Sequence, residues 1–103
     1  MKSILHDKAQ RTCYLCALLH DDWMIRSSLE EHHIFGGYNR KKSEKYGLKV
    51  YLCPEHHRTG REAVHQEDKN GNKRLLQAIA QEKFNEVYKD LNFISVFGKN
   101  YIA

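Results

Sequence analysis

The stretch LKVYLCPEHHRTG, residues 48–60, joins a candidate strand to a compact group of metal-ligand side chains. Apolar residues alternate with Lys and Tyr over Leu48–Leu52, and this two-residue period predicts a half-buried strand. Pro54 can occupy the first turn of a helix, so a short helix is expected from about Glu55 until Gly60 interrupts it. The stretch therefore predicts a strand that leads directly into a helix carrying two histidines.

Cysteine and histidine spacing predicts a zinc site. The pair Cys13-x-x-Cys16 is matched downstream by Cys53-x-x-His56, and either spacing lets one tight turn present two ligands to a tetrahedral ion. Buried free thiols beside a surface histidine are the alternative, which requires two spaced pairs to coincide by chance. We therefore expect these four side chains to bind a structural Zn²⁺.

Length and composition predict one small globular domain over residues 1–103. A chain of 103 residues builds only a small core, so a structural metal would add needed stability. Its three cysteines are an odd number, which argues against a complete disulfide framework. Neither a bilayer-spanning apolar run nor the apolar core of a secretory signal is found. We expect a cytoplasmic protein without membrane contact or a small-molecule substrate.

The front of the chain shows several local patterns. Residues 1–12 are expected to be a weakly packed lead-in to a motif spanning residues 13–65. Within this motif Tyr14–Leu19 and Trp23–Ile25 are apolar runs on either side of a polar turn, which predicts two short extended segments. A further strand is expected over residues 31–35, ended by two glycines, and residues 38–47 are expected to form a loop to the next strand.

The back of the chain, residues 72–103, is expected to form a helical packing region and tail. Apolar residues recur at three- and four-residue spacing from Asn72 to about Leu91, which predicts an amphipathic helix. Another helical turn is expected over residues 93–97, stopped by Gly98, with residues 101–102 docking on the core. Together the elements predict an α+β fold.

Adjacent histidines occur twice in the sequence, and their placement suggests hydrolytic chemistry. His32 and His33 end one predicted strand, whereas His57 begins the helix after the other, so the element order brings them together. Phosphodiester hydrolysis needs a base to activate water and a cation to stabilise charge on the phosphate, which histidines and a metal supply. The alternative for His32 and His33 is one surface ring and one core ring.

These motifs resemble a known family. The segments EHHIFGG, residues 31–37, and LCPEHHRTG, residues 52–60, with a Cys-x-x-Cys pair upstream, are similar to the HNH (His-Me finger) endonucleases. Among these the short bacterial and bacteriophage members carry a zinc knuckle, a small loop around a structural zinc ion. The resemblance covers about residues 13–65, and it implies a ββα-metal core to which the C-terminal helices are added.

The resemblance also implies residue roles. His33 corresponds to the general base, while His32 and His57 correspond to ligands of a catalytic divalent ion, Mg²⁺, Mn²⁺ or another. The resemblance implies cutting of DNA to leave a 3′-hydroxyl and a 5′-phosphate, in the cytoplasm of the bacterial host if the protein is phage-encoded.

The chain departs from the family pattern at two positions. The central Asn of the family falls on Leu48, which leaves its loop-bracing role unassigned, and a further helix histidine falls on Arg61. We expect His65, the next histidine, to complete the catalytic metal site. Its alternative role is that of a polar residue near the second helix.

Basic residues surround the predicted site. The chain has 17 Lys and Arg against 13 Asp and Glu, a net charge of +4 that is compatible with DNA as partner. A run in the predicted loop, followed by Lys49, would bind phosphates without base preference, although a merely solvated loop is the alternative. Arg58 and Arg61 follow His57 closely and are expected to orient a scissile phosphate. The residues of the run are Arg40, Lys41, Lys42 and Lys45.

The combined patterns predict a metal-dependent DNA endonuclease. A catalytically inactive zinc-binding module is the main alternative, binding nucleic acid or acting as an adaptor in a phage packaging or recombination complex. The missing Asn favours this alternative, whereas the presence of His32, His33 and His57 together argues against it. A zinc protein with a purely structural role would leave the paired histidines unexplained.

Overall fold

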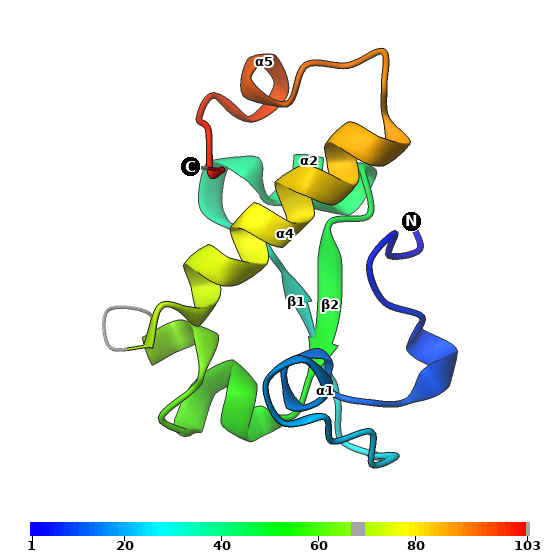
Figure 1. Cartoon of the computed structure of the whole chain (residues 1–103), viewed down its shortest axis with the longest axis vertical. Coiled ribbons are helices and arrows are strands. Elements are labelled where there is room, and N and C mark those ends of the chain that lie inside the picture. Colours follow the sequence, from blue (N-terminus) through cyan, green and yellow to red (C-terminus); the bar gives the residue numbers. More distant parts are fainter. Residues whose placement is uncertain (67–69, 103) are drawn as a thin grey trace.

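The computed structural model describes residues 1–66 and 70–102 and has an α+β fold (Figure 1). Two strands and four helices are the larger elements: α1 (Tyr14–His20), β1 (Glu30–His33), α2 (Arg40–Lys45), β2 (Lys49–Leu52), α4 (Asn72–Val87) and α5 (Phe93–Phe97). Short 3-10 or π turns connect them: η1 (Lys8–Gln10), η2 (Gly37–Asn39), η3 (Glu55–Thr59) and η4 (Val64–Gln66). No helix in the described ranges is long and apolar enough to cross a membrane.

The sheet consists of β1 paired antiparallel with β2. Its register sets His32 opposite Val50 and His33 opposite Lys49, so alternation along β1 sends the two histidines to opposite faces. The predicted strand at residues 48–52 is confirmed, but every residue of β2 is buried rather than every second one. Lys49 is buried because ion pairs with Glu31 and Glu44, at 3.3 and 3.0 Å, compensate its charge.

The N-terminal segment contacts β2 through residues 3–6, so the predicted weakly packed lead-in at residues 1–12 is wrong for these residues, whereas residues 7–11 are exposed. Ser3 Oγ donates a hydrogen bond to the Lys49 carbonyl, and the amide of Ile4 donates to the Gly47 carbonyl at 2.9 Å. The His6 ring accepts a hydrogen bond from the Tyr51 amide at 3.1 Å and is itself buried. These bonds satisfy backbone groups on the side of β2 that β1 leaves unpaired.

Residues 14–20 form the helix α1, so the extended segment predicted for Tyr14–Leu19 is wrong. The Cys13 sulfur accepts a hydrogen bond from the Cys16 amide as the N-cap, and Asp21 ends the helix in the left-handed conformation at φ 52°. A six-residue apolar run does not distinguish a strand from a buried helix by period alone. The extended strand predicted for Trp23–Ile25 is also absent from the structure, and these three side chains are exposed.

Helix α4 packs across the sheet and supplies much of the core (Figure 1). Leu76, Ala80 and Phe84 are fully buried on its inner face. The helix ends at Val87 rather than near Leu91, and its predicted apolar stripe is narrower than expected because Leu75, Val87 and Leu91 are exposed. The core combines apolar residues of α4, β2 and α5 with Ile34 and Phe35, which follow β1, and it includes the three cysteines.

The predictions for the end of the chain are confirmed. Helix α5 stops at Gly98, which adopts φ 82° as the left-handed C-cap. The Tyr101 ring then lies 5.0 Å from the Phe35 ring, so the tail docks on the core.

The connection between the strands is helical, and the loop predicted for residues 38–47 is wrong. Helix α2 occupies most of it and places Ser43 in the interior, with no exposed surface. The Ser43 hydroxyl accepts a hydrogen bond from the Phe35 amide at 3.2 Å and donates one to the Leu48 carbonyl. One side chain therefore links the residues that follow β1 to the residue that precedes β2.

Replacing Ser43 tests this link. Ser43→Ala removes the acceptor of the buried Phe35 amide, whereas the Leu48 carbonyl keeps its bond from the Ile34 amide, so we expect the free energy of unfolding to fall by about 1–3 kcal/mol. Urea denaturation followed by circular dichroism measures the change. Ser28→Ala, at an exposed serine, is the matched control and should unfold like the wild type. Equal stability of both variants would contradict the structural role of Ser43.

Candidate metal centres

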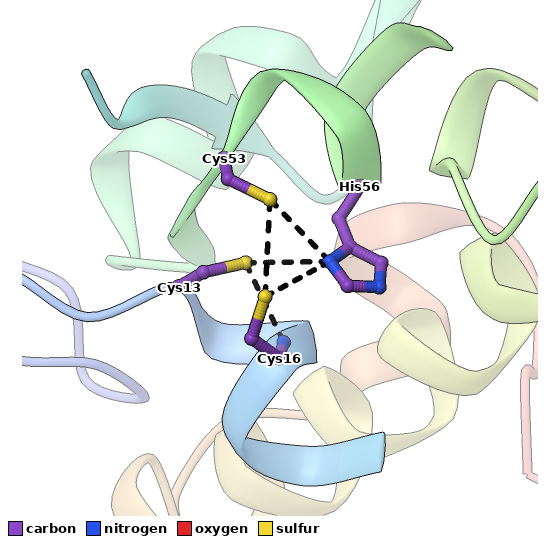
Figure 2. Close-up of side chains that lie close together, drawn as sticks. All are labelled: Cys13, Cys16, Cys53 and His56. Atoms are coloured by element: carbon purple, nitrogen blue, oxygen red, sulfur yellow. Dashed lines mark hydrogen bonds between the residues drawn. The ribbon is translucent and has the colours of Figure 1, made fainter. Parts of the chain in front are cut away.

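Cys13, Cys16, Cys53 and His56 converge on one buried point (Figure 2). His56 Nδ1 lies 3.7, 3.2 and 3.4 Å from the sulfurs of Cys13, Cys16 and Cys53. The sulfurs of Cys16 and Cys53 are 3.8 Å apart. Ligands at about 2.0–2.3 Å from a tetrahedral zinc ion are roughly 3.5 Å from one another, so the four atoms fit such an ion. The cluster could bind a metal such as zinc, as the spacing predicted.

Two local structures bring these ligands together. Cys13 caps α1 and Cys16 lies in its first turn, whereas Cys53 directly follows β2 and His56 lies in η3. Burial, together with the neighbouring thiols, raises the pKa of Cys16 to about 12. Three converging sulfurs therefore need a cation before they can all ionise, which is what a divalent ion would supply.

The cysteine–histidine cluster is surrounded by polar groups, and the sequence analysis did not predict these groups. Glu62 Oε1 accepts hydrogen bonds from His56 Nε2 at 2.8 Å and from His20 Nε2 at 2.6 Å. Arg26 Nη2 lies 3.5 Å from the Cys16 sulfur and 3.1 Å from Asp22. Because the carboxylate of Glu62 occupies Nε2, the Nδ1 lone pair of His56 faces the sulfurs.

A second group consists of three histidines, His32, His57 and His65. One nitrogen of each ring lies within 4.8 Å of the others, and the three come from β1, η3 and η4. Among the described residues His32 Nε2 is buried and has no hydrogen-bond partner. Burial, and then the nearby histidines, lower the pKa of His32 to about 3, so its ring is neutral at physiological pH. The structure thus brings together all three residues that we predicted as ligands of a catalytic ion.

Glu30 contacts this group from the side. Its Oε1 accepts a hydrogen bond from His57 Nδ1 at 2.7 Å, and this bond is the main reason why the pKa of Glu30 is lowered. Arg58 Nε lies 3.7 Å from the same oxygen. The sequence offered no signal for Glu30, which lies one residue before the strand predicted at residues 31–35.

His33 lies on the other face of β1. Its Nε2 is 2.8 Å from Glu44 Oε1 and 3.5 Å from Glu31 Oε1, and both carboxylates also contact Lys49. Hydrogen bonds from the N-terminal ammonium, His33 and Lys49 lower the pKa of Glu44 far below its usual range. An ionised carboxylate therefore orients the His33 ring, and sequence reasoning missed it because α2 was expected to be a loop.

One cleft of about 300 Å³ is shared by His33 and the three-histidine group. Of the predicted phosphate-binding residues, Arg40 and Arg58 line it, and Lys73, which was not predicted, joins them. Its lining residues are Glu31, His32, His33, Ile34, Gly36, Arg40, His57, Arg58, Val64, His65 and Lys73. The cleft therefore combines imidazoles with a basic border.

The other predicted basic residues lie elsewhere. Arg61 lines a separate hollow beside His20 and Glu62. Lys42 donates a hydrogen bond to the Val96 carbonyl at 2.7 Å, and Lys45 lies over the Tyr46 ring at 5.3 Å. Lys41 is exposed on α2 and, like Lys42 and Lys45, is not among the residues that line the cleft.

Comparison with known proteins does not identify the chain: no family model matches it, and no curated protein or solved structure is significantly similar. The resemblance to HNH endonucleases therefore rests on the motif residues alone.

Zinc content tests the four-residue centre. Because thiolates are available to zinc only in the folded arrangement, metal binding and folding are linked. We expect one tightly bound Zn²⁺ per chain by elemental analysis, and loss of the cooperative unfolding transition when a strong chelator removes it. Cys16→Ser should have the same effect, and returning Zn²⁺ should refold only the wild type. Purified folded protein without bound metal would contradict the assignment.

Proposed function

We propose that the protein is a metal-dependent endonuclease of the His-Me finger type, in which β1, β2 and η3 form the ββα-metal core. The observation that carries the proposal is the shared cleft. Its three converging histidines include a buried nitrogen without a partner, and they lie beside a fourth histidine oriented by a carboxylate. A ligand group and an oriented base within one basic cleft are the parts that phosphodiester hydrolysis requires.

His33 acts as the general base in this proposal. With its Nε2–H donated to Glu44, the lone pair of Nδ1 is available to accept a proton from an attacking water. Glu44 stays ionised and stabilises the charged ring after proton transfer, as the carboxylate of a catalytic triad does. Arg40 and Arg58 would bind the phosphate at the border of the cleft.

The three-histidine group would hold the catalytic ion. A divalent ion bound there supplies positive charge to the scissile phosphate and to the leaving oxygen. Imidazole nitrogens suit transition-metal ions, whereas Mg²⁺ prefers oxygen ligands and six-fold coordination. The donor set of His32, His57 and His65 therefore favours Mn²⁺, Zn²⁺ or Ni²⁺ over Mg²⁺.

Ser43 supports the proposal at the position where the family pattern is broken. The family uses an Asn to brace the loop between its strands, and this chain has Leu48 there. The Ser43 hydroxyl bonds the backbone at both ends of the connection between β1 and β2. A loop brace is thus available without the Asn.

A DNA-binding module without catalysis is the second candidate. The observation that favours it is the enclosure of His33: its side chain is 9% exposed, with Glu31 and Glu44 on its Nε2. A ring held in this way can also have a purely structural role.

Plasmid cleavage separates the two candidates. We expect the zinc-loaded protein to cut supercoiled plasmid with Mn²⁺, and His33→Ala to lower the single-turnover rate by about 10²- to 10⁴-fold, because the base is lost. Binding of Mn²⁺ should remain. In the companion variant His57→Ala, a high Mn²⁺ concentration should partly restore the rate, because the lost group is a ligand. Wild-type cutting by His33→Ala would contradict the role of His33 as the base, whereas a wild-type protein that binds DNA but does not cut it would favour the binding module.

The salt dependence of DNA binding tests the cleft border. Each phosphate contact contributes about 0.9 to the slope of log K against log salt concentration, so Arg40→Ala with Arg58→Ala should lower the slope by about 2. The matched double variant Lys41→Ala with Lys45→Ala, on α2 outside the cleft, should keep nearly the wild-type slope. Fluorescence anisotropy with a labelled duplex, without divalent ion, measures both slopes. A lower slope in the Lys41→Ala, Lys45→Ala variant with a wild-type slope in the Arg40→Ala, Arg58→Ala variant would place the DNA on α2.

A further inference from the structure

His56 and His57 are adjacent in η3, yet they bond to glutamates through opposite ring nitrogens. His56 directs Nδ1 at the three sulfurs and donates Nε2–H to Glu62. His57 donates Nδ1–H to Glu30, which leaves Nε2 for the group that it forms with His32 and His65. The two rings therefore need opposite tautomers although they are neighbours in the chain.

The carboxylates explain how each tautomer is selected. A neutral imidazole carries one proton, and the nitrogen that donates it to an ionised acceptor cannot bind a metal. Glu30 lies 2.7 Å from His57 Nδ1, and Glu62 lies 2.8 Å from His56 Nε2. Each glutamate thus determines which nitrogen of its histidine has a free lone pair.

The sheet makes Glu30 suitable for this role. Glu30 and His32 are two residues apart in β1, so they lie on the same face, and the register places them opposite Leu52 and Val50. One strand therefore supplies both a member of the histidine group and the acceptor for a second member. The His57 side chain is 6% exposed, so its ring has little room to turn away from the carboxylate.

We propose that Glu30 is the positioning residue of the three-histidine site: its hydrogen bond holds His57 as the Nδ1–H tautomer with Nε2 directed at His32 and His65, and thereby sets the affinity for a divalent ion. This inference rests on the metal site of the proposed nuclease and identifies the residue that preorganises it. Glu62 has the equivalent role for His56 at the cysteine cluster. Loss of such an outer partner commonly weakens metal binding by about 10- to 100-fold.

Calorimetric titration of Co²⁺ into protein that already holds one Zn²⁺ tests the proposal without any cleavage assay. We expect Glu30→Ala to weaken Co²⁺ binding by about 10- to 100-fold, while its zinc content and thermal midpoint stay near those of the wild type. Glu62→Ala is the matched control, since it removes the same group from the neighbouring histidine. It should leave Co²⁺ affinity unchanged and speed the loss of Zn²⁺ to a chelator.

Nitrogen-15 NMR of the zinc-loaded protein without Co²⁺ shows which nitrogen of His57 is protonated. A merely structural role of Glu30 would not change this tautomer. His57 should be protonated at Nδ1 in the wild type and should lose this fixed tautomer in Glu30→Ala. Glu30→Gln keeps an acceptor oxygen, so it should retain the tautomer and part of the affinity. Unchanged Co²⁺ affinity in Glu30→Ala, or a wild-type His57 protonated at Nε2, would overturn the proposal.

Failure of the nuclease proposal can be distinguished from failure of the proposed role of Glu30. Co²⁺ binding that depends on Glu30 in a protein that cuts no DNA would support the role of Glu30 and contradict only the nuclease activity. A wild-type protein that binds no second ion would overturn both.

Discussion

The convergence of three thiols and one imidazole on a single buried point is the constraint on which the rest of the structure depends. It joins α1 to the end of β2, two segments that local sequence does not hold together. A chain of 103 residues builds only a small core, so a metal bound at this point would add to the contacts that orient these elements. Because His56 is a member of this cluster, the orientation of η3 is set there, and the position of His57 follows from it.

Pairing of β1 with β2 then divides the chemistry between two faces. Glu30 and His32 share the face of Val50 and Leu52, whereas Glu31 and His33 share the face of Lys49. Side chains from both faces nevertheless line one cleft, which holds Glu31 and His33 together with the three-histidine group.

A carboxylate orients each of three histidines: one in the cysteine cluster, one in the three-histidine group, and His33. Glu44 bonds His33, Glu62 bonds His56 and Glu30 bonds His57. His32 differs, since burial and then the neighbouring histidines lower its pKa, and its Nε2 has no hydrogen-bond partner among the described residues. Hydrogen bonding to one nitrogen directs the other, so a few glutamates suffice to sort closely spaced imidazoles into separate roles.

The sequence by itself determined the features that depend on short spacing: the two ligand pairs, the strand before Cys53, the apolar helix from Asn72 and the stop at Gly98. Such features follow from the geometry of a single turn or strand. The helix α1 was missed because its apolar run is too short for its period to be decisive, and α2 was missed because its polar residues show no apolar stripe. Only the tertiary structure decided that Ser43 links the strands, that Lys49 is buried and that Glu30 contacts His57, because each depends on strand register and on partners distant in the chain.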